Sequence, residues 1–239
     1  MSTEESTDAA DLSMLQLADS FFPTGMYTMS SGLEAIFYSG SRKNNKMNAA
    51  ELRDLIKIFL EQQIGPADCT ALGNAYEHAS ASNLPLLLEV DDTIVAMRLV
   101  QEIRSASIRS GTQLVKCVHS FVPDSKILAD YAEAIKDGRA QGPYPVALAV
   151  AASALAIPKR KAGMMLLYSF SVSIIAAALR LGMLQHFDGQ KIIDELKPTI
   201  AKTVESFIDR PLDGIWQFAP QIDIIQIEHE RMSSKMFIT

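Results

Sequence analysis

The chain has 239 residues, of which 48% are hydrophobic, and a formal net charge of −6 with acidic residues spread along its length. This composition supports one large domain with a substantial buried core, because no Pro-, Gly- or Ser-rich linker divides the chain. It argues against a nucleic-acid partner, since no basic stripe is present to neutralise phosphates.

The N-terminus and the two cysteines indicate the compartment. Residues 1–11 are acidic and lack a basic stretch, so we expect a disordered tail here and not a signal peptide. Cys69 and Cys117 lie in helical apolar patterns without metal or redox spacing, which favours packed thiols in a reducing compartment. The sequence therefore predicts a cytoplasmic protein with a single folded domain over 12–239, including a C-terminal tail from about 211.

Apolar residues recur at three- and four-residue spacing through most of the chain, and alternating β patterns are nearly missing. This periodicity predicts an all-α, single-domain bundle of roughly ten helices with a flexible N-terminus and C-terminal tail. The helices expected in chain order cover about 12–20, the stretch around 33–37, 48–64, 67–81, a short segment from 83, 91–119, 124–137, 143–157, 163–184 and 188–210. Beyond Pro211 the helical pattern weakens, and an extended stretch is expected over 222–227.

Local signals set some of these boundaries. Asn48, with Glu51 three residues later, predicts a capping box at the start of a helix. Gly65 and Pro66 are expected to end that helix. Asp91 or Asp92 is expected to cap the helix over 91–119. Pro198 is expected to bend or restart the last long helix.

Residues 163–184 form the most apolar run and raise the alternative of a membrane span, since about twenty residues suffice to cross a bilayer. Arg180 interrupts the run, Ser169, Ser171 and Ser173 dilute it, and no aromatic belt flanks it. We therefore expect a central core helix that is hydrophobic all round, and no membrane contact.

The most distinctive stretch, residues 21–34, carries large apolar residues where a plain connection between helices would be polar; we call it the signature segment. Pro23 fixes its own φ and Gly25 can take a positive φ, so the turn would be rigid. The side chains that it would display are Phe22, Met26, Tyr27 and Met29. Rigidly displayed aromatic and Met side chains are typical of protein recognition. A tight helix–helix connection with N-capping serines explains the same residues, and composition alone does not separate these interpretations.

Catalytic groupings are hard to find in the sequence. The four histidines, which are scattered and lack partner motifs, are His78, His119, His186 and His229. Catalysis needs a nucleophile with a base, converging groups of tunable pKa or a metal cluster, so we expect neither an enzyme nor a cofactor. The chain has no Gly-x-x-x-x-Gly-Lys-Ser/Thr loop to bind nucleotide phosphates, which argues against an NTPase.

Glu228, His229 and Glu230 are the best candidates for a metal site, because carboxylates and imidazole together can ligate a divalent cation. A solvated, charged tail explains the same residues, and we prefer that interpretation. Cys117 and His119 lie two residues apart on a presumed helix and point to different faces, so they are not expected to share a metal.

Charged residues inside apolar helices are a second unusual feature. Glu102 and Arg104 lie two residues apart and cannot pair along one helix face, so each requires a partner on another helix or subunit. Arg109 and Arg180 lie in comparable surroundings. We favour ion pairs that hold the fold over catalytic groups.

Five blocks of residues occur in the order found in one known family. The first comprises Leu15, Gln16, Leu17, Phe22, Pro23, Gly25, Tyr27, Ser30, Gly32, Leu33 and Glu34. The later blocks comprise Glu102, Arg104, Ala106 and Gly111; Tyr144, Pro145 and Val146; Ala177, Ala178, Arg180, Leu181, Gly189 and Gln190; and His229, Glu230, Lys235, Met236 and Phe237. In these blocks the chain resembles the UreF family of urease maturation proteins, and the resemblance extends from about residue 14 to the end.

The resemblance implies an all-α homodimer that is not an enzyme. Members of that family bridge a UreD-type protein (UreH in some organisms), which contacts apo-urease, to the GTPase UreG, and nickel reaches urease through that complex. The resemblance implies partner contacts in the signature segment and in the C-terminal tail, which would become ordered on binding. The residues it proposes for partner binding are Met26, Tyr27, Met29, Ser30, Glu34, His229, Glu230, Lys235 and Phe237. Structural or dimer contacts are expected at Glu102, Arg104, Arg180 and Gln190.

Two residues depart from the family pattern. Lys235 stands where the family usually has arginine, so the fork of donors that fits a carboxylate or phosphate is lost. Met29 stands where many members have a polar residue, which favours a more apolar partner surface. Two alternative functions remain: a nickel-binding carrier, or a GTPase-activating regulator of UreG that supplies an exposed arginine such as Arg42 or Arg231.

Overall fold

The computed structural model describes residues 3–42 and 47–239, with side chains for 7–39 and 47–239. Within these residues the protein is helical and contains no strand, which confirms the all-α prediction, and its helices enclose one continuous hydrophobic core. The α-helices are α1 (Thr3–Ala18), α2 (Leu33–Arg42), α3 (Ala49–Phe59), α4 (Thr70–Ser80), α5 (Leu84–Met97), α6 (Gln101–Phe121), α7 (Lys126–Lys136), α8 (Tyr144–Ala154), α9 (Lys159–Arg180), α10 (His186–Phe207) and α11 (Pro220–Glu230). The other helical segments are η1 (Met26–Thr28), η2 (Leu60–Cys69) and η3 (Leu212–Gly214).

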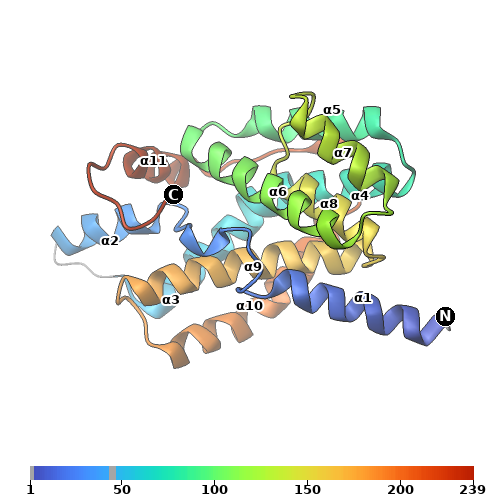
Figure 1. Cartoon of the computed structure of the whole chain (residues 1–239). Coiled ribbons are helices and arrows are strands. Elements are labelled where there is room, and N and C mark those ends of the chain that lie inside the picture. The colour runs from blue at the N-terminus through green and yellow to red at the C-terminus, as the bar shows by residue number, and fades with distance from the viewer. Residues whose placement is uncertain (1–2, 43–46) are drawn as a thin grey trace.

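Helix α9 runs through the centre of the domain (Figure 1). In that view α10 lies below α9, and α4 to α8 form a layer above it. Helix α1 lies against α9 with its N-terminus pointing away from the body, while α2 and α11 pack together at the other end. The C-terminus lies beside α2 and α11, so residues from both ends of the sequence meet at this end of the domain.

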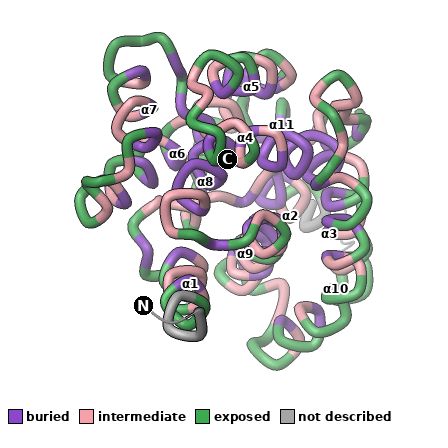
Figure 2. The backbone as a smooth tube through the Cα atoms, turned by 90° about the vertical axis from the view of Figure 1, so that its right-hand side faces the viewer, coloured by how far each residue is buried: buried purple, intermediate pink, exposed green. Residues whose placement is uncertain are grey.

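Burial is greatest in α8 and in the helices around it (Figure 2). Helix α8 is apolar throughout and is covered by α4 and α6. Two glycines let backbones approach closely: Gly73 of α4 faces the residue that follows α10, and Gly111 of α6 faces the segment that leads into α8. A Cβ atom at Gly73 would lie 1.8 Å from the backbone oxygen of Ile208, and one at Gly111 would lie 2.1 Å from that of Gly142. This tight packing fixes α6, whose first turn carries Glu102.

The predicted capping box is confirmed. The Asn48 side chain accepts hydrogen bonds from the amides of Ala50 and Glu51 at 2.9 and 3.0 Å, and the amide of Asn48 donates to the Glu51 carboxylate at 2.8 Å. Amides at the N-terminus of α3 that have no partner within the helix are thereby satisfied.

The expected break at Pro66 is wrong, because α3 continues directly into η2, a π-helical segment that contains this proline. The wider turns leave carbonyl groups free, and the amides of Phe218 and Trp216 donate to the carbonyls of Gln62 and Pro66 at 2.9 and 3.4 Å. Similarly, α10 continues through Pro198 without a restart. Segment η2 therefore anchors the connection between α10 and α11.

The helix expected over 91–119 is wrong, since α5 and α6 are separate helices. Asp91, which was expected to cap that helix, is fully buried within α5. Its carboxylate accepts hydrogen bonds from the Tyr131 hydroxyl at 2.5 Å and from the amides of Gln141 and Gly142 at 2.8 and 3.1 Å. Tertiary contacts, and not a helix start, explain this acidic residue.

The stretch 222–227 is helical in α11, so the expected extended conformation is wrong. Its run of isoleucines is compatible with a strand, but Gln226 and His229 are buried at helical spacing, while Ile224 and Ile227 are 57% and 38% exposed. The buried polar side chains find partners inside the protein, which fixes the helix in this orientation.

We expected a disordered tail over 1–11, but residues 3–11 form the start of α1. Asp11 forms an ion pair with Lys161 of α9, and Ala10 and Leu17 are buried. Contacts of α1 with α9 therefore stabilise a helix whose sequence alone is weakly amphipathic.

Helix α9 is the one helix, among those in the described part of the chain, that is long and apolar enough to span a membrane. In its most apolar stretch 61% of the residues are buried inside the protein. Ser171 and Ser173 donate hydrogen bonds to the carbonyls of Leu167 and Phe170 at 2.8 and 2.7 Å, so their hydroxyls are satisfied in the interior. The core helix expected over 163–184 is therefore present as α9.

Both cysteines are free thiols. Cys69 is buried at the end of η2, and desolvation raises the pKa of its thiol to about 12. Cys117 is half-buried on α6. The high pKa keeps Cys69 neutral and unreactive near neutral pH, as expected of a packed thiol.

Candidate functional site

The signature segment forms a compact turn between α1 and α2. Gly25 has a φ of 79°, in the left-handed region, and η1 begins directly after it. The amide and the hydroxyl of Thr28 both donate to the Gly25 carbonyl, at 3.1 and 2.8 Å. Tyr27 is 62% exposed, whereas Met26 and Met29 are half-buried. The expected display of Phe22 is wrong, because its side chain is buried in the hydrophobic core. The turn is thus rigid, and Tyr27 is its most displayed candidate side chain.

The C-terminal tail, residues 231–239, lies against the signature segment. The amide of Ile238 donates to the Thr28 carbonyl at 2.9 Å, and the amide of Ser30 donates to the Thr239 carbonyl at 2.8 Å. The Ser30 hydroxyl also donates to the Thr239 carbonyl. Backbone pairing therefore holds the end of the tail to the turn.

Glu34, at the start of α2, is an acceptor for donors that lie far along the chain. The amides of Met236 and Phe237 donate to its carboxylate at 2.8 and 3.1 Å, and Nε2 of His229 lies 3.0 Å from it. The Glu34 side chain is only 1% exposed, and a buried carboxylate without such donors would be strongly unfavourable. Glu34 therefore ties the tail to α2.

Glu102 of α6 completes this network from the other side. Its carboxylate lies 2.8 Å from Nδ1 of His229 and accepts from the Lys235 ammonium at 2.7 Å. Lys235 also donates to the Glu230 carbonyl at 3.1 Å. Because carboxylate oxygens only accept, both contacts of the His229 ring are hydrogen bonds when both ring nitrogens carry hydrogen. The network joins α2, α6, α11 and the tail.

Arg180, at the end of α9, links the turn to the tail. Its guanidinium donates to the Tyr27 carbonyl and lies 4.3 Å from the centre of the Phe237 ring. A guanidinium over an aromatic face is attractive, and here it covers a ring that is 3% exposed. Partial burial lowers the pKa of Arg180 below its usual value.

The residues proposed for partner binding divide into two sets by burial. The enclosed residues are Ser30, Glu34, His229 and Phe237, and those at the surface are Tyr27, Glu230 and Lys235, with Met26 and Met29 between the two sets. The enclosed side chains contact the tail, the turn or each other, so in this arrangement they do not face a partner. We expected the tail to dock only on partner binding; it is docked here because its amides and Phe237 find buried partners in the same chain.

The residues proposed for structural or dimer contacts have different surroundings. Glu102 and Arg180 bind the tail from α6 and α9. Arg104 donates to the carbonyl of Arg98 at 3.2 Å, which closes the bend between α5 and α6. Gln190 is exposed on α10. These four residues therefore do not form one cluster.

Glu228, His229 and Glu230 do not converge on a common point. The His229 ring is buried between Glu34 and Glu102, whereas Glu228 and Glu230 are exposed. Across residues 3–42 and 47–239 no group of three or more His, Cys, Asp or Glu is placed to hold a metal ion. A cation at His229 would have to displace its present contacts with Glu34 or Glu102.

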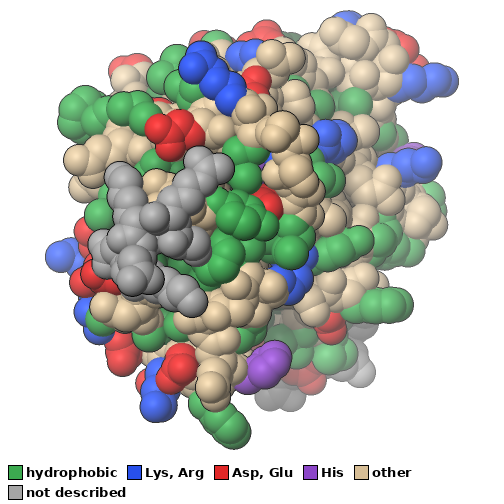
Figure 3. Space-filling view, turned by 90° about the vertical axis from the view of Figure 1, so that its left-hand side faces the viewer, with side chains coloured by type: hydrophobic (Ala, Val, Ile, Leu, Met, Phe, Trp, Pro, Cys, Tyr) green, Lys and Arg blue, Asp and Glu red, His purple; other side chains and the backbone are tan. Residues whose placement is uncertain are grey.

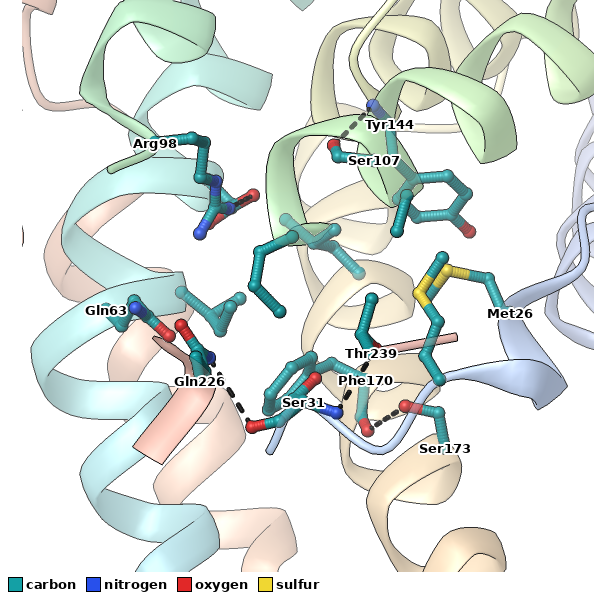
Figure 4. A pocket seen from close by; sticks show the side chains of 16 residues that line it. Met26, Ser31, Gln63, Arg98, Ser107, Tyr144, Phe170, Ser173, Gln226 and Thr239 are labelled. Atoms are coloured by element: carbon teal, nitrogen blue, oxygen red, sulfur yellow. Dashed lines mark hydrogen bonds and ion pairs between the residues drawn. The ribbon is translucent and has the colours of Figure 1, made fainter. Parts of the chain in front are cut away.

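A small, partly open pocket of about 70 Å³ is lined by Thr239, the last residue of the docked tail (Figure 4). Met26 and Tyr144 line one side of it, Arg98 lies on the opposite side, and Thr239 lies between them. Oδ2 of Asp68 and Nε of Arg98 are buried here without a hydrogen-bond partner in the described part of the chain. A space of this size with unpaired polar atoms suits a few water molecules.

Sequence reasoning missed the ion pair between Asp68 and Arg98, which is buried at the wall of this pocket. Burial raises the pKa of the Asp68 carboxyl, and the Arg98 guanidinium opposes that rise. The available signal was an acidic residue beside Cys69 in an otherwise apolar stretch. Its partner lies 30 residues away between two helices, so spacing did not reveal it.

The end of the molecule that carries α2 and α11 has a mixed surface, with hydrophobic side chains interspersed among Lys, Arg, Asp and Glu (Figure 3). The exposed apolar side chains of α11 and the tail are Ile224, Ile227, Met236 and Ile238. Apolar side chains among charges of both signs are typical of surfaces that meet another protein.

A helical domain with a rigid turn, a docked tail and exposed apolar side chains among charges of both signs fits the class of accessory proteins that act by binding other proteins. The UreF family model matches residues 46–197. The chain is 27% identical over 226 residues to the urease accessory protein UreF of Trichodesmium erythraeum, covering 95% of each chain. It is 30% identical over 227 residues to urease accessory protein UreF 1 of Brucella melitensis, covering 95% of this chain and 92% of the relative. The chain belongs to the UreF family of urease accessory proteins, and it is not an enzyme.

Proposed function

We propose that this chain is a cytoplasmic, non-catalytic scaffold that bridges a UreD-type (UreH-type) protein and the GTPase UreG during nickel insertion into apo-urease. Membership of the UreF family supports a role in urease maturation. The observation that carries the scaffold role is the exposure of Tyr27 on a turn that Gly25 and Arg180 hold rigid. A large aromatic side chain in a fixed position is a typical anchor of protein interfaces.

The docked tail supports the same proposal. Met236 is 61% and Ile238 is 42% exposed, although the residue between them, Phe237, is buried. The tail therefore presents apolar side chains from a backbone that Glu34 and Thr28 already hold in place. Ordering the backbone in advance lowers the entropic cost that a partner would otherwise have to offset.

The proposal includes a homodimer. Leu12 and Leu15 lie three residues apart on α1 and are 66% and 62% exposed, which leaves an apolar stripe that a second copy can cover. We expect light scattering to give the mass of two chains, and Leu15→Asp to shift the protein toward the monomer. A monomer in both proteins would contradict this part of the proposal.

The decisive test is co-purification with Tyr27→Ala. We expect unchanged helix content by circular dichroism and weakened recovery of the UreD-type protein or of UreG. Phe187→Ala is the matched control, because Phe187 is an aromatic side chain that is 82% exposed on another element, α10. If Tyr27→Ala recovers both partners fully, the turn has a structural role only. If the unmodified chain recovers neither partner, the scaffold proposal is refuted.

The two alternatives receive different support. A GTPase-activating role needs an accessible cation, and Arg231 is exposed at the start of the tail, whereas the side chain of Arg42 lies outside the described residues. Unchanged GTP hydrolysis in an assembled complex would exclude activation. For a nickel carrier we have no supporting contact, because the His229 ring is occupied by Glu34 and Glu102. A nickel titration that shows tight binding, lost in His229→Ala, would reverse that judgement.

A further inference from the structure

An open groove of about 540 Å³ lies on the surface between the signature segment and α6, apart from the pocket lined by Arg98 and Thr239. Pro23 and Met29 line it from the turn, Ile108 lines it from α6, and Ile238 lines it from the tail. A Cβ atom at Gly25 would meet no other atom within 4 Å, so the turn borders free space here. Apolar side chains from three separate parts of the chain therefore line the groove, together with the polar residues Thr24, Thr28, Ser110, Thr112 and Gln113.

One positive charge borders the groove, although the chain as a whole is acidic. Arg109 is the charged residue among those that line it. Arg109 is exposed and makes no ion pair with the described residues. The sequence 103–123 contains no acidic residue, and Glu102, the one carboxylate of α6, is committed to His229 and Lys235. The positive charge at Arg109 is thus left uncompensated within α6.

The basic character continues along the outer face of α6. Arg109, Gln113 and Lys116 are exposed at spacings of four and three residues, which places them on one face of the helix. With a rise of about 1.5 Å per residue, the two cations stand about 10 Å apart along the axis. A partner with carboxylates at a similar spacing would meet both of them.

We propose that this groove and the adjoining face of α6 receive an acidic, partly apolar segment of a partner protein. A carboxylate pairs with Arg109, and an apolar side chain lies between Met29 and Ile108. A single arginine beside apolar and uncharged polar side chains suits a carboxylate of a protein segment, whereas phosphate groups of nucleic acids are bound by many cations together. The inference rests on the scaffold role proposed above and deepens it by assigning a docking groove and the charge of its occupant.

The test is calorimetric titration of the full-length chain with the purified UreD-type protein and with purified UreG from the same organism, at low and high salt. We expect Arg109→Glu to weaken the binding of one of these partners by about tenfold and to reduce the salt dependence of that binding, because a charge contact is reversed. Lys116→Glu should weaken the same titration by a smaller factor. Lys202→Glu is the matched control: it makes the same charge change at an exposed position on α10 and should leave the affinity unchanged.

Three results would contradict the proposal that the groove binds an acidic segment of a partner protein. The first is wild-type affinity in Arg109→Glu while the unmodified chain binds. The second is an equal loss in Lys202→Glu, which would show an effect of net charge. The third is a change in the sedimentation of Arg109→Glu alone, which would assign the groove to a second copy of this chain. If the unmodified chain binds neither partner, the scaffold proposal itself fails, and that outcome is separate from the other three.

Discussion

Glu34 and His229 lie 195 positions apart in the chain, yet the Glu34 carboxylate is 3.0 Å from Nε2 of His229 in the interior. The opposite nitrogen of the same ring lies 2.8 Å from Glu102. One imidazole thereby joins α2, α6 and α11. Two motifs that are distant in the sequence, the signature segment and the C-terminal His-Glu pair, form one structural unit.

Removal of the Glu34 carboxylate should release the tail. In Glu34→Ala the amides of Met236 and Phe237 lose their acceptor and His229 loses one contact, so we expect the free energy of unfolding to fall by about 3 kcal/mol. Urea denaturation measures the loss, and amide exchange of residues 231–239 locates it. Glu230→Ala, an exposed site, should change stability little, and a tail equally protected in both variants would contradict the assignment.

Arg180 should contribute to tail docking through its planar guanidinium. We expect Arg180→Ala to lower stability by about 1 kcal/mol, because the contact with the Phe237 ring and the hydrogen bond to the Tyr27 carbonyl are both lost. Arg180→Lys retains the charge but not the stacked geometry and should restore only part of the loss. Thermal unfolding of the three proteins checks this order, and full restoration by lysine would show that charge alone matters.

Asp91 should give the protein a defined pH dependence. Burial raises the folded-state pKa of Asp91 above its ordinary value of 3.8, against the opposing effect of the Tyr131 hydrogen bond. The folded state therefore holds this proton more tightly than the unfolded state, so the contribution of Asp91 to stability is complete below pH 3.8 and is lost as the pH rises through the folded-state pKa.

The measurement is the free energy of unfolding of the wild type minus that of Asp91→Asn, at stepped pH from about 3.5 upward. This difference should decrease with rising pH and then become constant. Taking the difference cancels other groups that titrate in both proteins, such as Asp68. A difference that stays constant or increases with pH would contradict the burial argument.

Backbone contact at Gly111 should make that position intolerant of any side chain. In Gly111→Ala the new methyl group would lie 2.1 Å from the Gly142 oxygen, and we expect a loss of about 3 kcal/mol as α6 and α8 move apart. Gly182→Ala is the control, since its added atom meets nothing within 4 Å and only the positive φ of 68° opposes it, at about 1 kcal/mol. Similar melting temperatures for the two variants would contradict the close packing.

Helical periodicity and local capping signals predicted much of the fold. The capping box at Asn48 depends on residues within three positions of each other, so the sequence alone revealed it. Asp91 looked like a helix cap, but its partners lie 40 to 51 residues further along the chain. The isoleucines of α11 looked like a strand because the reason for the helix, the inward contacts of Gln226 and His229, depends on α2 and α6.

The sequence singled out the residues of the candidate site but not how they pack, and their role in partner binding stays a prediction. Tyr27 was expected at the surface and is exposed. Glu34, His229 and Phe237 were expected to meet a partner, and they are buried against the tail and the turn instead. A sequence pattern indicates that Glu34, His229 and Phe237 are related. Whether their side chains face inward depends on the packing of α9 and α11.

The π-helical turns of η2 make the protein sensitive to the number of residues there. Each residue of a helix adds about 100° of rotation and about 1.5 Å of rise, so deleting one residue would rotate and shift α4 against α8. The close fit of Gly73 against the backbone of Ile208 would be lost. The Gln62 carbonyl would no longer meet the amide of Phe218, which precedes α11. The position of α11 and of the tail that follows it thus depends on the number of residues in η2, a segment that carries none of the proposed partner contacts.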